Sequence, residues 1–339
     1  MDAGKRIRGL AAAALLGLAL PLAAERPIAG AIGGLSLGEP KFFEGLTVIP
    51  LLGRASPQAA GCATLEQALE RGWLTIVEKD GGSVPEVWVN NRSDTIVFLM
   101  GGEILSGARQ DRIVRQDVLV GPRRRRLAVP VYCVEEGRWH YTSNSFGSER
   151  NLGTYKLRAK AQAGGPEGQS GVWAEVARAN DEAGVSSSTG AYQDAYRDGR
   201  VSRKIEELER ELADLARRHP QAVGAIVGLG GSIVSLDLFA DPHLFRSTAL
   251  VAWGQQGKAR VTRRQASELL ALLAGADCRA RETPDLGSAF AFRNERWDAN
   301  ALVLDGALLH LAAVPRQPEE AGGGEEPLDG THRQRQYGE

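Results

Sequence analysis

Short apolar runs separated by turn residues fill the chain between Leu46 and Glu136, and they constrain its fold more than any other feature. They are LTVIPLL, WLTIVEK, VPEVWVNN, TIVFLM, RIVRQDVLV and RLAVPVYCVEE. Short runs rich in β-branched residues are typical of strands. One helix interrupts them at TLEQALERG, with Thr64 as its N-cap and Gly72 after its end. Residues 40–140 are therefore predicted to be β-rich.

Helices and hairpins are predicted for residues 171–313. The segment VSRKIEELERELADLARRHP has one apolar stripe and predicts a helix that packs on a sheet. Hairpins are expected with tips at Gly230–Gly231 and at Asp305–Gly306. This order of elements favours an α+β fold with a mixed, mainly antiparallel sheet and packed helices. We take residues 35–313 as a single composite domain, although two domains fit equally well, and expect residues 315–339 to be disordered.

Residues 1–24 are predicted to form a signal peptide. Basic residues from Lys5 to Arg8 precede the stretch GLAAAALLGLALPLAA, which is too short to span a bilayer comfortably and ends in Pro21 and small residues. Cleavage is expected after Ala24, with Ala23 as an alternative. We therefore expect a periplasmic or secreted protein without stable membrane insertion after cleavage; a retained N-terminal anchor is the alternative.

Charge and cysteine usage exclude several functional classes. The 339 residues include 41 basic and 42 acidic ones, a formal net charge of -1, so no overall field draws the protein to nucleic acid. A single disulfide among Cys62, Cys133 and Cys278 would leave one thiol unpaired, and the sequence does not choose the pair. There is no C-x-x-C unit and the histidines lack ligand spacing, so we predict no metal and no cofactor.

The segment GGEILSGARQDR, residues 101–112, is the best candidate for a site. Glycines permit a tight backbone path here, and a loop between strands can present Glu103 and the following polar residues to a ligand. We assume a four-residue loop at 121–124, which places Val120 opposite Arg125. Counting back along both strands then pairs Val118 with Leu127, Val114 with Val131, Arg112 with Cys133, and Gln110 with Glu135.

The predicted site binds a small polar or anionic ligand, or a partner. Its residues are Gly102, Glu103, Gln110, Asp111, Arg112, Glu135, Arg138 and Trp139. Trp139 would stack on the ligand, while Arg112 or Arg138 would contact an anion. A hydrolase that uses Glu103 and Glu135 as acid and base is the first alternative, and a structural envelope protein is the second. An inert network of ion pairs would explain the same residues.

Three sequence segments resemble a known family. GGEILSGARQDRIVRQDVLV followed by VPVYCVEEGRWHY, and then SSSTGAY, is similar to the domain family named for its association with ADP-ribosylglycohydrolases and rhodanese-phosphatases. The resemblance covers about residues 35–313. It implies a link to ADP-ribose or phosphate-ester processing through genomic neighbours, which is an association rather than a mechanism.

The leader generates the first testable prediction. Intact-mass measurement of the protein from its native host should give a mature N-terminus at residue 24 or 25, because a short apolar stretch after basic residues is a substrate of the secretory pathway. A chain that begins at Met1 in the membrane fraction would contradict it.

Overall fold

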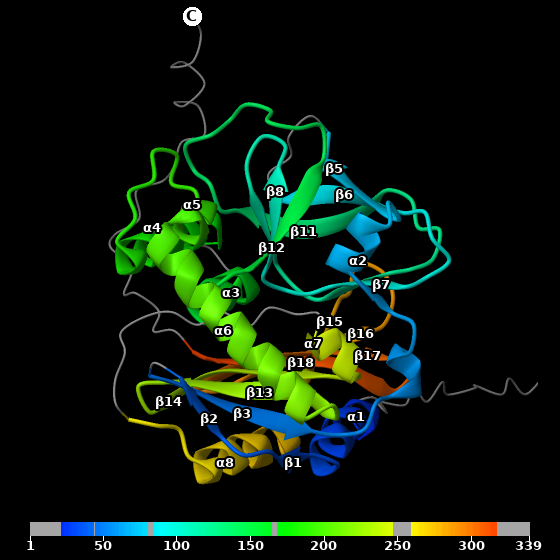
Figure 1. Ribbon diagram of the computed structural model, residues 1–339. Helices are drawn as coiled ribbons and strands as arrows, with labels where there is room; N and C mark the ends of the chain where they lie inside the picture. The colour runs from blue at the N-terminus through cyan, green and yellow to red at the C-terminus, as the bar shows by residue number, and fades with distance from the viewer. Residues whose placement is uncertain (1–21, 44, 81–84, 165–167, 247–258, 317–339) are drawn as a thin grey trace, which may run out of the picture.

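A closed barrel and a large sheet form the two layers of the computed structural model, which describes residues 22–43, 45–80, 85–164, 168–246 and 259–316 (Figure 1). The barrel order is β11-β6-β5-β12-β8-β9. Its strands are β5 (Leu74–Glu78), β6 (Glu86–Asn91), β8 (Glu103–Gly107), β9 (Arg112–Val114), β11 (Leu127–Cys133) and β12 (Phe146–Leu152).

The large sheet has nine strands in the order β1-β3-β13-β14-β18-β17-β16-β15, with β2 also on β3. They are β1 (Ser36–Leu37), β2 (Lys41–Phe43), β3 (Leu46–Leu52), β13 (Ala222–Leu229), β14 (Ser232–Phe239), β15 (Arg279–Arg281), β16 (Ser288–Arg293), β17 (Trp297–Leu304) and β18 (Ala307–Pro315). A small third sheet contains β4 (Ala63–Thr64), β7 (Val97–Leu99) and β10 (Val118–Val120).

Helices cover both layers. They are α1 (Leu22–Gly33), α2 (Leu65–Glu70), α3 (Tyr155–Ala163), α4 (Gly168–Ala183), α5 (Gln193–Arg197), α6 (Gly199–Arg218), α7 (Pro242–Arg246) and α8 (Arg263–Ala274), with a 3-10 turn at Pro57–Ala59. Helices α1 and α8 lie on the outer face of the large sheet, and α6 runs from the barrel to the sheet (Figure 1). The predicted α+β class is confirmed, and the sheets are mainly antiparallel, with β4 and β7 parallel.

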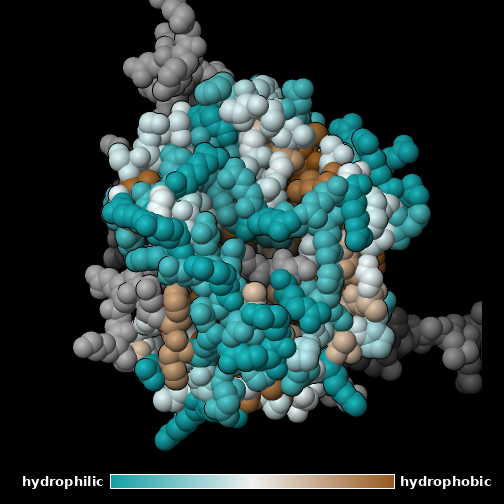
Figure 2. Space-filling model, in the orientation of Figure 1, coloured by the Kyte–Doolittle hydropathy of each residue, from teal (hydrophilic) through white to brown (hydrophobic). Residues whose placement is uncertain are grey.

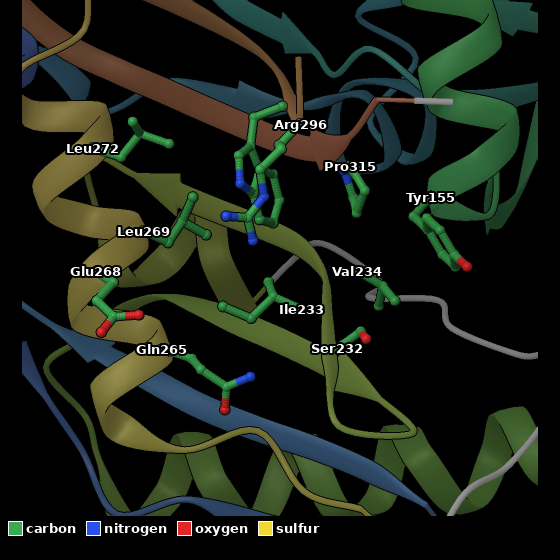
Figure 3. A pocket seen from close by; sticks show the side chains of 11 residues that line it. Tyr155, Ser232, Ile233, Val234, Gln265, Glu268, Leu269, Leu272, Arg296 and Pro315 are labelled. Atoms are coloured by element: carbon green, nitrogen blue, oxygen red, sulfur yellow. The ribbon is translucent and has the colours of Figure 1, made fainter. Parts of the chain in front are cut away.

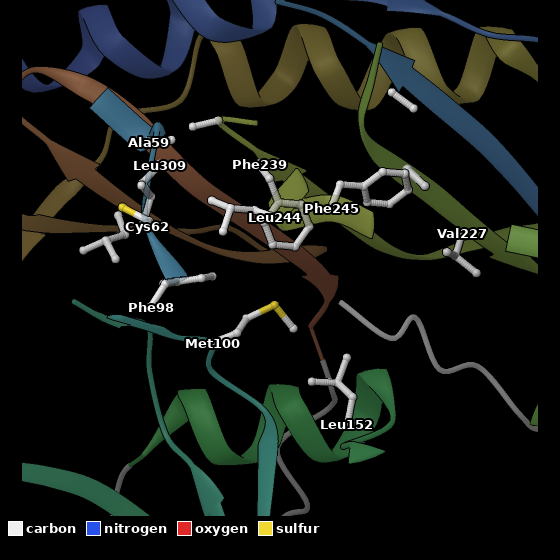
Figure 4. Packing of buried hydrophobic residues seen from close by; sticks show 14 of the residues in the cluster. Ala59, Cys62, Phe98, Met100, Leu152, Val227, Phe239, Leu244, Phe245 and Leu309 are labelled. Atoms are coloured by element: carbon white, nitrogen blue, oxygen red, sulfur yellow. The ribbon is translucent and has the colours of Figure 1, made fainter. Parts of the chain in front are cut away.

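Apolar side chains fill the space between the two layers. Phe98 and Met100 from the barrel side meet Phe239, Leu244 and Leu309 from the sheet side (Figure 4). A second cluster fills the barrel interior, and a third lies between the sheet and α1 and α8. The two parts of the chain that the sequence separates, 40–140 and 171–313, therefore share one core, since β3 pairs with β13.

Local sequence signals predict several elements correctly. Thr64 forms a complete capping box with Gln67 at the start of α2. The apolar stripe of α6 buries Val201, Leu208 and Leu215. Both predicted hairpins are present, β13–β14 and β17–β18. At the second tip, Asp305 and Gly306 have φ angles of 48° and 76°, as a two-residue type I′ turn requires.

The run RIVRQDVLV is not one strand, which corrects part of the predicted register. Residues 112–114 pair with β11 in the barrel, whereas residues 118–120 pair with β7 in the small sheet. Val120 therefore lies opposite Val97 rather than Arg125, and Val118 opposite Leu99 rather than Leu127. The polar stretch between the two halves turns the chain out of the barrel. The Arg112–Cys133 and Val114–Val131 pairs are confirmed, although the assumed loop was wrong.

Both ends of the chain are partly outside the described residues. Residues 1–21 of the expected signal peptide and residues 317–339 of the expected tail are among those not described. Helix α1 begins at Leu22 and buries Ile28 and Ile32, which follow the expected cleavage site. Strand β18 includes Pro315, where the tail was expected to begin. Within the described part, no helix is long and apolar enough to cross a membrane.

A chain of charged side chains also joins the two layers. Asp117, between β9 and β10, accepts a hydrogen bond from the Gly101 amide at 2.8 Å and lies 2.6 Å from Nδ1 of His310 on β18. Nε2 of His310 is 3.4 Å from Asp237 on β14. Both carboxylate oxygens of Asp237 accept hydrogen bonds from the Arg158 guanidinium of α3, at 2.6 and 3.0 Å.

Opposite charges alternate along this ion chain, which runs from Asp117 through His310 and Asp237 to Arg158. Burial alone would lower the pKa of His310, but Asp117 and Asp237 raise it to about 9, so the imidazole is protonated. Burial alone would raise the pKa of Asp237, but Arg158 and His310 hold it well below its usual range. Two cations thus face two carboxylates, and His310 and Asp237 have no exposed surface.

Removing one charge from this chain should destabilise the fold. We expect Asp237→Asn to lower the free energy of unfolding at neutral pH by about 3 to 5 kcal/mol, because it leaves two buried cations short of a partner. The pKa of Asp237 is lowered in the fold, so this contribution is present at neutral pH and is lost in acid. Chemical denaturation measures it. Asp305→Asn at the exposed hairpin tip is the matched control, and an equal loss in both variants would contradict the prediction.

Candidate functional site

Arg138 is the centre of a buried polar network at one end of the barrel. Its Nε donates to Glu135 at 2.8 Å, and Nη2 lies 3.0 Å from Oδ1 of Asp111. Nη1 donates to the carbonyl of Ala108 at 2.8 Å and to the hydroxyl of Thr142 at 3.1 Å. The guanidinium therefore ties together the loops that follow β8 and β11.

The two carboxylates of this network differ in acidity. Burial raises the pKa of Asp111 to about 6, against the hydrogen bond from the Gly107 amide and the charge of Arg138. Burial also acts on Glu135, but hydrogen bonds and the charge of Arg138 outweigh it and lower its pKa. Glu135 is held further by the Thr189 hydroxyl at 3.0 Å.

Arg112 is fully buried beside this network. Its Nη1 donates to Sγ of Cys133 at 2.8 Å and to Oε1 of Gln110 at 3.2 Å, and its Nη2 lies 3.5 Å from Glu78. Burial raises the pKa of the Cys133 thiol to about 11, which disfavours the thiolate that a nucleophile needs. Cys62, Cys133 and Cys278 form no disulfide with one another.

The structure thus brings together five predicted site residues: Gln110, Asp111, Arg112, Glu135 and Arg138. Most of their polar atoms form hydrogen bonds with one another or with the backbone of the loops. The network therefore stabilises the loops and leaves few polar atoms to bind a ligand. None of the five lines either of the two cavities described below. Gln110 does not continue the strand pairing opposite Glu135, because β9 begins at Arg112 and Glu135 bridges to Ala191.

Trp139 extends from this network into solvent. It is 50% exposed and Tyr141 is 49% exposed. The guanidinium of Arg109 lies 5.4 Å from the Trp139 ring centre and 4.6 Å from the Tyr141 ring centre. The cation beside Trp139 is therefore Arg109, which the sequence did not single out, and not Arg112 or Arg138.

Glu103 lies at the start of β8, whereas Glu135, after β11, belongs to the Arg138 network beside the end of β8, so the structure does not bring the predicted carboxylate pair together. Glu103 is the first residue of β8, and Gly107, its last, donates to Asp111 in the Arg138 network. Four residue steps at about 3.3 Å each separate the two ends by about 13 Å. The acid and base roles assigned to these residues therefore lack a shared site.

The backbone around Glu103 explains its position. Gly102 has a φ of 107°, and a Cβ there would lie 2.6 Å from Cγ of Arg158. Only glycine fits this close approach, so Gly102 packs on the ion chain and does not line the described cavities. The carboxylate of Glu103 accepts a hydrogen bond from the Met100 amide at 2.8 Å. Burial raises the pKa of Glu103 to about 8, and the charges of Glu66 and Asp117 contribute in the same direction.

A cavity of about 810 Å³ lies beside Glu103, between α2, β12 and α6. Thr64, the N-cap of α2, and Gln67 within α2 contribute polar groups to its wall, as do Arg150 and Asn151 of β12. Leu212 and Ala216 of α6 form an apolar side. The face of the molecule that carries α6 is mainly hydrophilic (Figure 2).

Several lining residues could not be found from the sequence. Glu66 and Arg150 line the cavity near Glu103, and Glu66 accepts a hydrogen bond from Ser148 on β12. Their proximity depends on how α2 docks on β12, and no local pattern encodes that docking. Across the described ranges, no cluster of three or more His, Cys, Asp or Glu side chains could hold a metal ion.

Comparison with known proteins supports the resemblance that the motifs suggest. Neither a curated protein nor a solved structure matches the chain. A family model matches residues 34–314. Because this match covers most of the chain, including both layers and the Glu103 turn, the protein belongs to the family described as the ARG and Rhodanese-Phosphatase-superfamily-associated Protein domain.

Proposed function

We propose that this domain binds a small polar ligand in the cavity beside Glu103. The observation that carries the proposal is a carboxyl group with a pKa of about 8 in the wall of an 810 Å³ cavity. That volume lies in the range of small-molecule sites, which combine an apolar wall with a few placed polar groups. A perturbed carboxyl group in such a cavity supports a site more strongly than the closed Arg138 network does.

The chemistry of the wall suggests the ligand class. Protonated Glu103 can donate a hydrogen bond to a carbonyl, hydroxyl or phosphate oxygen, while the Met100 amide fixes its other oxygen. The amide oxygen of Asn151 offers an acceptor at the wall. Arg150, Arg217 and Arg246 also line it, but Arg150 is paired with Glu66 and Glu70, and Arg217 with Asp214, so Arg246 is the arginine best placed to meet an anionic group. A hydroxyl-rich ligand with an anionic group, such as ADP-ribose or a sugar phosphate, fits these groups.

The family description is consistent with a binding role. It names an association with ARG and rhodanese-phosphatase proteins rather than an activity of this domain. We propose that the domain supports such chemistry by holding a ligand. Export to the periplasm remains part of this proposal, and it would restrict the ligand to molecules present outside the cytoplasm.

The binding proposal predicts a contrast between two Glu103 variants. With ADP-ribose or ribose 5-phosphate, the wild-type melting temperature should rise at neutral pH and rise less above about pH 8, where Glu103 ionises. Glu103→Gln keeps a donor and an acceptor, so its ligand response should persist at both pH values. Glu103→Leu should lose the response. Trp139→Ala, far from the cavity, is the control.

Two outcomes would contradict binding at this cavity. One is an absence of any shift in the wild type across nucleotides, sugar phosphates and oligosaccharides. The other is an equal response in the wild type and in Glu103→Leu.

Glu103 should also make the free protein less stable as pH rises. Its pKa is about 8 in the fold against an ordinary 4.5, so the unfolded chain releases the proton first. Its contribution to stability is fully present below pH 4.5, declines as pH rises, and is lost above about pH 8. The melting temperature of Glu103→Gln relative to the wild type should therefore rise between about pH 5 and pH 8. Glu206→Gln, exposed on α6, should show no such trend.

A further inference from the structure

A second cavity, of about 560 Å³, lies where the large sheet splits (Figure 3). Strand β14 pairs with β13 from Ser232 onward, but with β18 only from Leu236 to Phe239. Strand β18 ends at Pro315, which has no amide hydrogen for a further ladder bond. The first residues of β14, Ser232–Val234, therefore diverge from β18 and form one wall of the cavity.

The walls of this cavity are largely apolar. Helix α8 contributes Leu269 and Leu272, and β14 contributes Ile233. These side chains point toward the open space between α8 and β14 (Figure 3). Leu272 is 38% exposed, one of few large apolar side chains left open to solvent among the described residues. An apolar surface of this kind favours a ligand with a hydrocarbon part.

One cation lies among these apolar groups. The guanidinium of Arg296 points into the space above Ile233 (Figure 3). Within the described ranges, this guanidinium has no hydrogen bond or ion pair. The backbone of Arg296 is bound, its amide to Asn294 at 2.8 Å and its carbonyl to the Arg316 amide at 2.9 Å. The other charged group at the wall, Glu268, is held by Arg264 at 2.8 Å. At the cavity wall, the Glu268 carboxylate is therefore already ion-paired, whereas the Arg296 guanidinium has no partner among the described residues.

We propose that this cavity binds an amphipathic anion, a medium-chain carboxylate, with its chain on Leu269 and Leu272 and its head group on Arg296. Guanidinium groups form paired hydrogen bonds with carboxylates. Arg296 is exposed, so it can meet the head group at the mouth of the cavity while the hydrocarbon chain covers Leu269 and Leu272. The site is separate from Glu103, since the two cavities share no lining residue.

Calorimetric titration of the full chain with octanoate, octanol and octylamine tests the proposal. Octanoate should bind the wild type, while octanol and octylamine should bind at least about tenfold more weakly because they lack the anionic group. Arg296→Met should weaken octanoate binding by about tenfold or more, and Leu272→Glu, which adds a negative charge at an exposed position, should do the same. Arg279→Met, an exposed arginine of β15 away from the cavity, should bind as the wild type does.

Three results would overturn it. The first is no octanoate binding to the wild type at millimolar concentration. The second is equal affinity for octanol or octylamine, which would leave no role for Arg296. The third is an Arg296→Met variant that binds as Arg279→Met does. Glu103→Leu should leave octanoate binding unchanged, so failure of this proposal and failure of sugar-phosphate binding are distinguishable.

Discussion

The buried ion chain from Asp117 to Arg158 is the interaction on which the arrangement of the two layers depends. Apolar contacts between barrel and sheet favour burial, but they fix no single orientation. Asp117 and His310 interact only when the loop after β9 lies directly over β18, and Asp237 meets Arg158 only when α3 lies over β14. Buried charges have few alternative partners, so the ion chain favours one alignment of the barrel on the large sheet.

The buried ion chain from Asp117 to Arg158 also determines where Glu103 lies. Asp117 binds the amide of Gly101, and Arg158 packs on Gly102, so the turn before β8 is fixed from both sides. This turn holds the Glu103 carboxyl at the cavity wall. Charges of the chain also act on it, since Asp117 raises its pKa while His310 lowers it. The same buried charges therefore influence both the position of Glu103 and the pKa of its carboxyl group.

Local sequence patterns correctly predicted helix caps and tight turns. They did not predict most of the contacts between residues far apart in the sequence. The capping box at Thr64 and the Asp305–Gly306 turn depend on neighbouring residues, so the sequence reveals them. The register of Arg112 with Cys133 was right, whereas that of Val118 was wrong. The spacing of apolar residues does not reveal that the strand breaks at residues 115–117 and that β10 joins another sheet. Five of the predicted site residues come together around Arg138. Glu103 was separated from them because the strand direction of β8 places it at the other end of the barrel.

The pairing of β3 with β13 has a consequence for how the chain folds. Ile49 pairs with Ile226, a sequence separation of 226 minus 49, or 177 residues. The barrel strands lie between these partners in the sequence, so the barrel is an insertion within the sheet. Contacts between residues so far apart in sequence carry an entropic cost of loop closure, and they slow the folding of a domain. The inserted barrel shortens the effective loop once it has formed, because it brings its two ends together. During synthesis, the edge of β3 that pairs with β13 therefore lacks its native partner until residues 222–229 have been made.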